Sequence, residues 1–82
     1  MENKFDNEII LNLVREVFNS ISEQPICINL DSKKTDVSEW GSLFHLHLIV
    51  ELEEKFDVEF TTQEIEKLDA VNQIIEKIKS KI

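Results

Sequence analysis

Apolar side chains recur with a helical period in the first quarter of the chain. Between residues 5 and 21 they occupy the positions Phe5, Ile9, Ile10, Leu13, Val14, Val17, Phe18 and Ile21. Steps of three and four residues place them on one broad face of a helix. Because Pro25 cannot lie inside a helix, we expect this helix to end near Ser22.

The helical period is lost between residues 23 and 41. Polar residues dominate there: Asn29, Asp31, Ser32, Lys33, Lys34, Thr35, Asp36 and Ser38. They predict a long loop, and a loop of this length in a small domain is often functional or fastened to the core. Five apolar residues are spaced to fasten it: Ile26, Ile28, Leu30, Val37 and Trp40. Ile26, Ile28 and Leu30 alternate as in a short strand, but no other segment of the chain offers a partner strand.

Three more helices are expected after the loop. The second fits residues 42–56. The segment from Thr61 to Glu64 has the form of a capping box, in which the two side chains each satisfy a free backbone N–H, so a short third helix should begin there and end near Leu68. Asp69 is then a candidate N-cap for a fourth helix. Its apolar stripe consists of Val71, Ile74, Ile75, Ile78 and Ile82.

These elements predict one all-α domain over residues 1–82. It should be a four-helix bundle of three longer helices and one short helix, with a long loop between helices one and two. A chain of 82 residues has room for one modest core, and the sequence contains no repeat or internal boundary.

The second predicted helix has two apolar faces. Successive residues lie 100° apart on a helix, which gathers one set on the core side: His45, Leu48, Ile49, Leu52 and Phe56. Leu43, Leu46 and Val50 lie nearly opposite, flanked by Glu51, Glu53 and Glu54. A small bundle needs one apolar stripe per helix, so the second stripe is either covered by the long loop or exposed for a partner. Its acidic flank and its start beside Ser42 favour a partner.

Charge and cysteine content narrow the functional classes. The formal net charge is -8, which disfavours nucleic acid and anionic membrane surfaces and suits a basic protein partner, although it also serves solubility. A single cysteine, Cys27, forms no intrachain disulfide and favours a reducing compartment. No segment has the pattern of a signal peptide or the length of a membrane span. We therefore expect a soluble cytoplasmic protein.

The sequence gives little support for a serine nucleophile, a calcium site or a reactive cysteine. Ser42 lacks the second glycine of the G-x-S-x-G motif, and His45 falls on the core face, where a hydrogen-bonded histidine is a better interpretation than a general base. The segment from Asp36 to His47 begins like a calcium loop but places His47 where a bidentate glutamate is required. Cys27 is expected to be a half-buried packing residue rather than a reactive thiol.

A serine can also serve as a point of covalent attachment. Such a serine needs exposure and a place for a charged adduct, and it needs no catalytic neighbours. The first turn of a helix offers free N–H groups and a positive dipole end, which favour a phosphate. The alternative is that Ser42 merely caps the helix.

The stretch W-G-S-L-F-H-L-H-L-I, followed by L-E-E-K-F-D-V-E-F, closely resembles the acyl carrier protein family. The family pattern is D-S-L, a helix with an L-[IV] pair, and then L-E-x-x-F-x-[IV]-x-[IF]. The matching residues are Ser42, Leu43, Leu48, Ile49, Leu52, Glu53, Phe56, Val58 and Phe60. The match continues through residues 64–68 and Val71. The resemblance covers roughly residues 5–80 and is specific from 40 to 78.

This resemblance implies a carrier rather than an enzyme. A phosphopantetheinyl transferase would attach 4'-phosphopantetheine from coenzyme A to Ser42, and the arm would hold an acyl or aminoacyl group as a thioester. The partners would be enzymes that load and transfer the group, as in fatty acid or secondary metabolite biosynthesis, and the carrier would be a monomer. By position, Leu43, Leu46 and Val50 match the family's apolar partner contacts, and Glu53 and Glu54 match its acidic ones.

The chain departs from the family pattern in two places. Gly41 stands where the family has aspartate; glycine is still an acceptable N-cap, but the lost carboxylate leaves open an unmodified, carrier-like interaction module. Phe44 and His47 occupy positions that are often acidic in carriers of fatty acid synthesis, which indicates specialised partners. Trp40 and His45 match the W-x-S-L-x-H form of stand-alone carriers.

Overall fold

The computed structural model describes residues 6–82. The first helix, α1, spans Asn7–Ile21. It begins at Asp6, whose Oδ1 accepts a hydrogen bond from the Ile9 N–H at 2.9 Å, and it ends where the Ser22 N–H donates to the Phe18 carbonyl. The predicted end at Ser22 is therefore confirmed. Phe5, expected in this helix, and the start of the expected domain at residue 1 lie outside the described residues.

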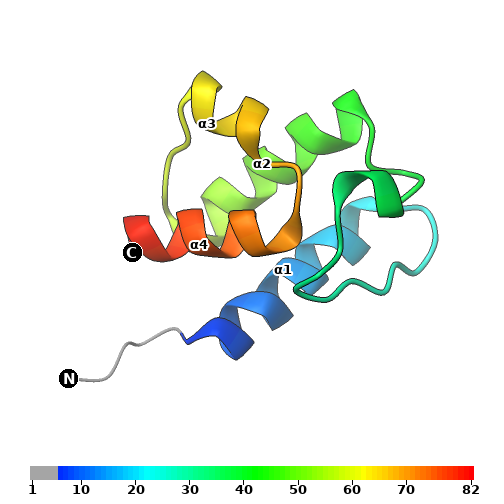
Figure 1. Ribbon diagram of the computed structural model, residues 1–82, viewed down its shortest axis with the longest axis horizontal. Coiled ribbons are helices and arrows are strands. Elements are labelled where there is room, and N and C mark those ends of the chain that lie inside the picture. The colour runs from blue at the N-terminus through cyan, green and yellow to red at the C-terminus, as the bar shows by residue number, and fades with distance from the viewer. Residues whose placement is uncertain (1–5) are drawn as a thin grey trace.

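Three further α-helices follow, as the sequence predicted: α2 at Ser42–Phe56, α3 at Thr62–Lys67 and α4 at Val71–Lys81. A 3-10 turn, η1, spans Lys34–Asp36 within the long loop. No strand is present in the part of the chain that is described, so the fold is the expected small helical bundle. The first helix packs against both α2 and α4 (Figure 1). None of the helices between residues 6 and 82 is long and apolar enough to cross a membrane.

The core lies where these helices meet. The predicted core face of α2 is confirmed, because its buried residues are His45, Leu48, Ile49, Leu52 and Phe56. They pack with the buried face of α1, which includes the fully buried Phe18, and with the apolar stripe of α4. Ile82, expected to end that stripe, is exposed at the C-terminus.

The long loop is fastened to α1 by hydrogen bonds between α1 side chains and the loop backbone, as well as by apolar contacts. The Asn19 side-chain amide pairs with both backbone polar groups of Ile26, at 3.1 and 2.8 Å, and Arg15 Nε donates to the Ile28 carbonyl at 2.8 Å. Ile28 and Trp40 are buried, and Ile26 and Val37 pack against the core. These contacts bring the end of the loop to a defined place at the start of α2.

One of the five expected loop anchors was wrong. Leu30 is exposed, because a turn begins one residue earlier. The Ser32 N–H donates to the Asn29 carbonyl, and the Asn29 side chain accepts from the Asp31 N–H. The turn ends the strand-like alternation before it reaches Leu30, which therefore points away from the core.

Asp69 does not cap α4, contrary to the sequence prediction. The N-cap is Ala70, which is held extended (φ -151°, ψ 152°) because it forms an antiparallel bridge with Lys33. The Lys34 N–H donates to the Asp69 carbonyl, and the Val71 N–H donates to the Ser32 carbonyl. The long loop therefore does find a backbone partner, in the linker before α4, and this pairing moves the helix start past Asp69.

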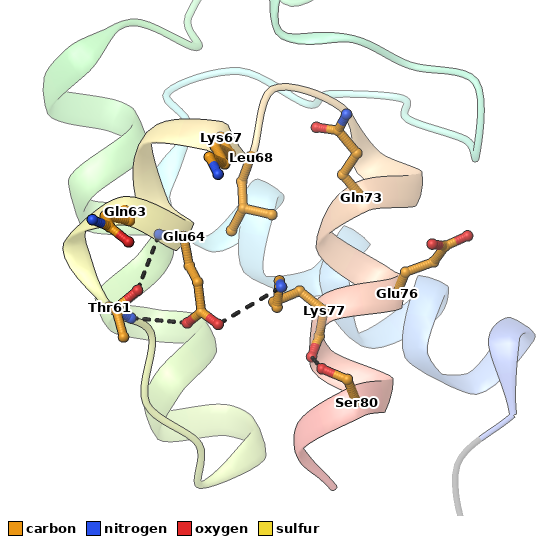
Figure 2. A pocket seen from close by; sticks show the side chains of 9 residues that line it. All are labelled: Thr61, Gln63, Glu64, Lys67, Leu68, Gln73, Glu76, Lys77 and Ser80. Atoms are coloured by element: carbon orange, nitrogen blue, oxygen red, sulfur yellow. Dashed lines mark hydrogen bonds and ion pairs between the residues drawn. The ribbon is translucent and has the colours of Figure 1, made fainter.

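The predicted capping box at the start of α3 is confirmed. Glu64 Oε1 accepts from the Thr61 N–H at 2.9 Å, and Thr61 Oγ1 accepts from the Glu64 N–H at 3.1 Å. The same carboxylate lies 3.0 Å from Lys81 Nζ and 3.7 Å from Lys77 Nζ of α4. It faces a hollow of about 510 Å³ between α3 and α4 (Figure 2). The hydrogen bond from the Thr61 backbone, followed by that from Lys81, lowers the pKa of Glu64 below its ordinary value of 4.5.

Glu64 should therefore stabilise the fold in a pH-dependent way. Because its folded-state pKa is lowered, its contribution is present above the unfolded-state pKa and is lost as the pH falls through the folded-state value. Glu64→Gln keeps an oxygen acceptor for the Thr61 N–H but removes the two ion pairs. We expect a lower melting temperature than wild type at pH 7 and a smaller difference near pH 3. Glu66→Gln, at an exposed position of the same helix, is the matched control and should change little at either pH.

Candidate functional site at the start of helix α2

Ser42 is the first residue of α2 and is exposed. The first helical hydrogen bond runs from the His45 N–H to the Gly41 carbonyl at 2.9 Å, so the N–H groups of residues 42–44 have no acceptor within the helix. Among residues 6–82, no group hydrogen-bonds the Ser42 hydroxyl. The serine oxygen is thus free, solvent-facing and close to the positive end of the α2 dipole.

Gly41 is the N-cap of α2, as predicted. Its backbone is extended (φ -99°, ψ -165°) and makes no side-chain cap, which is a conformation open to any residue. A Cβ placed there would meet no heavy atom within 4 Å. Neither space nor backbone conformation therefore requires glycine, and nothing in the structure explains why the carboxylate of the family pattern is missing.

The second apolar stripe of α2 is exposed along its length. Leu43 is 84% exposed, Leu46 is 55% and Val50 is 50%. The long loop therefore does not cover Leu46, and the role of the stripe in partner contact stays a prediction. The stripe begins at the residue after Ser42 and so forms one continuous surface with it.

The acidic residues beside the stripe differ in their surroundings. Glu54 is exposed, whereas Glu53 is half-buried, and its Oε2 accepts a hydrogen bond from the Phe60 N–H at 2.9 Å. Glu53 therefore fastens the segment after α2 to the helix. Its part in partner contact, expected from its position, stays a prediction.

His45 is buried and fully hydrogen-bonded, as its place on the core face predicted. Trp40 Nε1 donates to His45 Nδ1 at 2.8 Å, which places the imidazole proton on Nε2, where it donates to the Ile65 carbonyl at 2.8 Å. Both nitrogens are used, so His45 offers no lone pair to activate Ser42 as a general base. The Trp40 ring also packs edge-on against Phe18 at 5.0 Å. Residues 40–45 are thereby tied to α1 and α3, which positions the start of α2.

The metal site and the reactive thiol considered from the sequence can also be compared with the structure. No group of three or more potential metal ligands exists among residues 6–82. Cys27 is exposed, so the expectation of a half-buried packing residue was wrong. Its neighbours Ile26 and Ile28 both face the core, and the alternation of an extended chain then turns Cys27 outward.

The described structure has the fold of an acyl carrier protein, a small helical bundle that carries groups rather than transforming them. A solution NMR structure of holo acyl carrier protein from Geobacter metallireducens matches it with a TM-score of 0.71 and 27% sequence identity. The match covers 92% of this chain and 83% of that protein. No family model matches the sequence, and no curated protein matches it significantly.

Proposed function

We propose that this protein is an acyl or aminoacyl carrier that bears 4'-phosphopantetheine on Ser42. The observation that supports this most directly is the position of Ser42: an exposed hydroxyl, without a hydrogen-bond partner among residues 6–82, at the first residue of α2. The likeness to a holo acyl carrier protein over 92% of the chain supports it independently.

The residues around Ser42 fit the proposed group. A phosphodiester on the Ser42 oxygen would lie near the free N–H groups of the first turn, which favour an anion. The open space at Gly41 leaves room for it. When bound, the group supplies a thiol that holds an acyl or aminoacyl chain as a thioester, while this chain supplies the attachment point and the surface that partners recognise.

The exposed stripe of α2 would be that surface. Leu43, Leu46 and Val50 offer apolar contacts beside the attachment point, and Glu53 and Glu54 add negative charge to a protein of net charge -8. We expect a phosphopantetheinyl transferase and the enzymes that load and transfer the cargo to dock there through basic surfaces. The carrier would act as a monomer in the cytoplasm.

A second candidate function is an unmodified interaction module with a carrier-like fold. The observation that favours it is Gly41, since the carboxylate next to the serine in the family pattern is absent. In this case the same stripe would bind a partner without any covalent group.

The intact mass of the protein distinguishes the two candidates. The full chain is incubated with coenzyme A and a broad-specificity phosphopantetheinyl transferase. A mass gain of one phosphopantetheine is the expected result. No gain with several transferases would contradict the carrier proposal and leave the interaction module.

Restoring the missing carboxylate should aid modification. Gly41→Asp fits the open space and the extended backbone, and its side chain can accept from a free N–H of the first turn, which should stabilise the fold by about a few tenths of a kcal/mol. We expect faster modification of Ser42 than in wild type, measured as the initial rate of mass gain.

Gly41→Asn is the control for this variant, because it caps the helix without the charge. If Asp and Asn give the same rate as glycine, the carboxylate has no part in recognition of this carrier.

A further inference from the structure

A hollow of about 570 Å³ opens next to Ser42, between the end of α1, the long loop and the first turns of α2. Its apolar lining residues are Ile21, Leu43 and Phe44, and two acidic residues, Glu23 and Glu39, also line it. The hollow is therefore lined by both apolar and acidic side chains, and Leu43 is shared with the exposed stripe of α2.

The walls of the hollow are held in place. The half-buried Phe44 ring packs against Phe18, with ring centroids 5.7 Å apart, and it also lines the hollow. Glu39 Oε1 accepts a hydrogen bond from the Glu23 N–H at 3.1 Å, which holds that carboxylate at the edge. A site whose side chains are already ordered loses little conformational freedom when a ligand enters.

The negative charge of the hollow is not balanced within the described chain. Neither Glu23 nor Glu39 takes part in an ion pair with a residue between 6 and 82. His47 also lines the hollow, but its Nε2 lies 3.6 Å from Glu51 Oε2 one turn further along α2, so it is already placed against another carboxylate. A cation from outside the described residues is thus the complementary occupant.

We propose that this hollow receives an arginine side chain from a protein that docks at the start of α2. An arginine has an apolar stem that suits Ile21 and Leu43, and a planar guanidinium that can stack on Phe44 while it donates to Glu39. A lysine offers the charge but no planar face to stack. The inference rests on the proposed function, because the partner is taken to be a protein that acts at Ser42.

Another hollow differs from this one in its lining residues. It lies at the other end of α2, has a volume of about 550 Å³, and is lined by two valines and four carboxylates, among them Glu59. It contains no aromatic side chain. The proposed partner surface thus has an end with an aromatic side chain near Ser42 and an acidic end without one away from it, and we expect only the former to discriminate arginine from lysine.

The inference can be tested on the unmodified chain. Nα-acetyl-arginine methylamide is titrated into the ¹⁵N-labelled protein at constant ionic strength, and amide shifts are followed by NMR. We expect saturable shifts at Glu39 and Phe44, with a dissociation constant on the order of 1–10 mM for so small a ligand. Glu39→Gln keeps the acceptor for the Glu23 N–H and removes the charge, and it should weaken binding about two- to fivefold. Glu59→Gln removes the same charge from the other hollow and should leave binding at Phe44 unchanged.

The lysine and norleucine analogues of the arginine probe test which chemical features of the side chain the hollow recognises. The lysine analogue should bind more weakly than the arginine probe at Phe44, and the norleucine analogue should give no saturable shift. Equal binding of all three would show a merely apolar hollow and overturn the proposal, as would equal effects of Glu39→Gln and Glu59→Gln. Because no step requires a modified Ser42, the result is independent of the mass experiment, so a failure of either proposal can be told from a failure of the other.

Discussion

Ser42→Ala should abolish covalent modification of the protein by coenzyme A and a phosphopantetheinyl transferase. The Ser42 oxygen is the proposed attachment atom, and no other hydroxyl takes its place at the start of α2. The fold should survive, because the side chain is exposed and makes no hydrogen bond with residues 6–82, and such surface changes usually stay within about 0.5 kcal/mol. Intact mass reports the modification, and thermal unfolding reports the fold.

Ser38→Ala is the matched control for this loss. Ser38 is exposed and lies four positions before Ser42, in the loop rather than in the helix. We expect it to accept the modification as wild type does. A mass gain that persists in Ser42→Ala, or that disappears in Ser38→Ala alone, would place the attachment elsewhere and contradict the proposed site.

Much of α2 could be predicted from the sequence, because its signals are local. Its bounds at residues 42 and 56 were predicted correctly. Its five core residues and the position of its second apolar stripe follow from a 100° step applied to the apolar positions. The capping box at Thr61 was equally readable, since both of its hydrogen bonds join residues three apart. Such features depend on near neighbours in the chain and on little else.

The features that were missed depend on residues far apart in sequence. Asp69 was expected to cap α4, but the pairing of the following residue with Lys33 decides where that helix begins. His45 was correctly placed in the core, whereas its two partners, Trp40 and the Ile65 carbonyl, come from the loop and from α3. The pattern of apolar positions along a sequence does not show which polar groups will form hydrogen bonds between distant segments.

The candidate site also combines local features, which the sequence predicts, with long-range features, which it does not. The place of Ser42 at a helix start follows from local pattern, and so does the position of the apolar stripe beside it. The hollow next to it does not, because α1, the loop and α2 all contribute residues to its lining. Phe44 looked like a departure from an acidic position, and the structure makes it a packing partner of Phe18.

Leucine-to-alanine changes on the two faces of α2 should differ widely in their effect on the free energy of unfolding. Leu52 is fully buried and Leu46 is 55% exposed; both are leucines in the interior of the same helix, so replacement by alanine changes helix propensity equally. Leu52→Ala leaves a cavity in the core and should cost about 2–5 kcal/mol of the free energy of unfolding. That is a large share of the roughly 5–15 kcal/mol that stabilises a typical domain. Leu46→Ala should stay within about 0.5 kcal/mol. Urea unfolding of both variants measures the difference, provided that the slope with denaturant is unchanged.

The same pair separates stability from recognition. If the exposed stripe is a partner surface, Leu46→Ala should slow modification of Ser42 by the transferase although the protein is as stable as wild type. Leu52→Ala should retain the modification rate under conditions where it remains folded, because its side chain never reaches the surface. Similar losses of stability in both variants would mean that Leu46 is covered in solution, and the stripe would then belong to the core rather than to a partner.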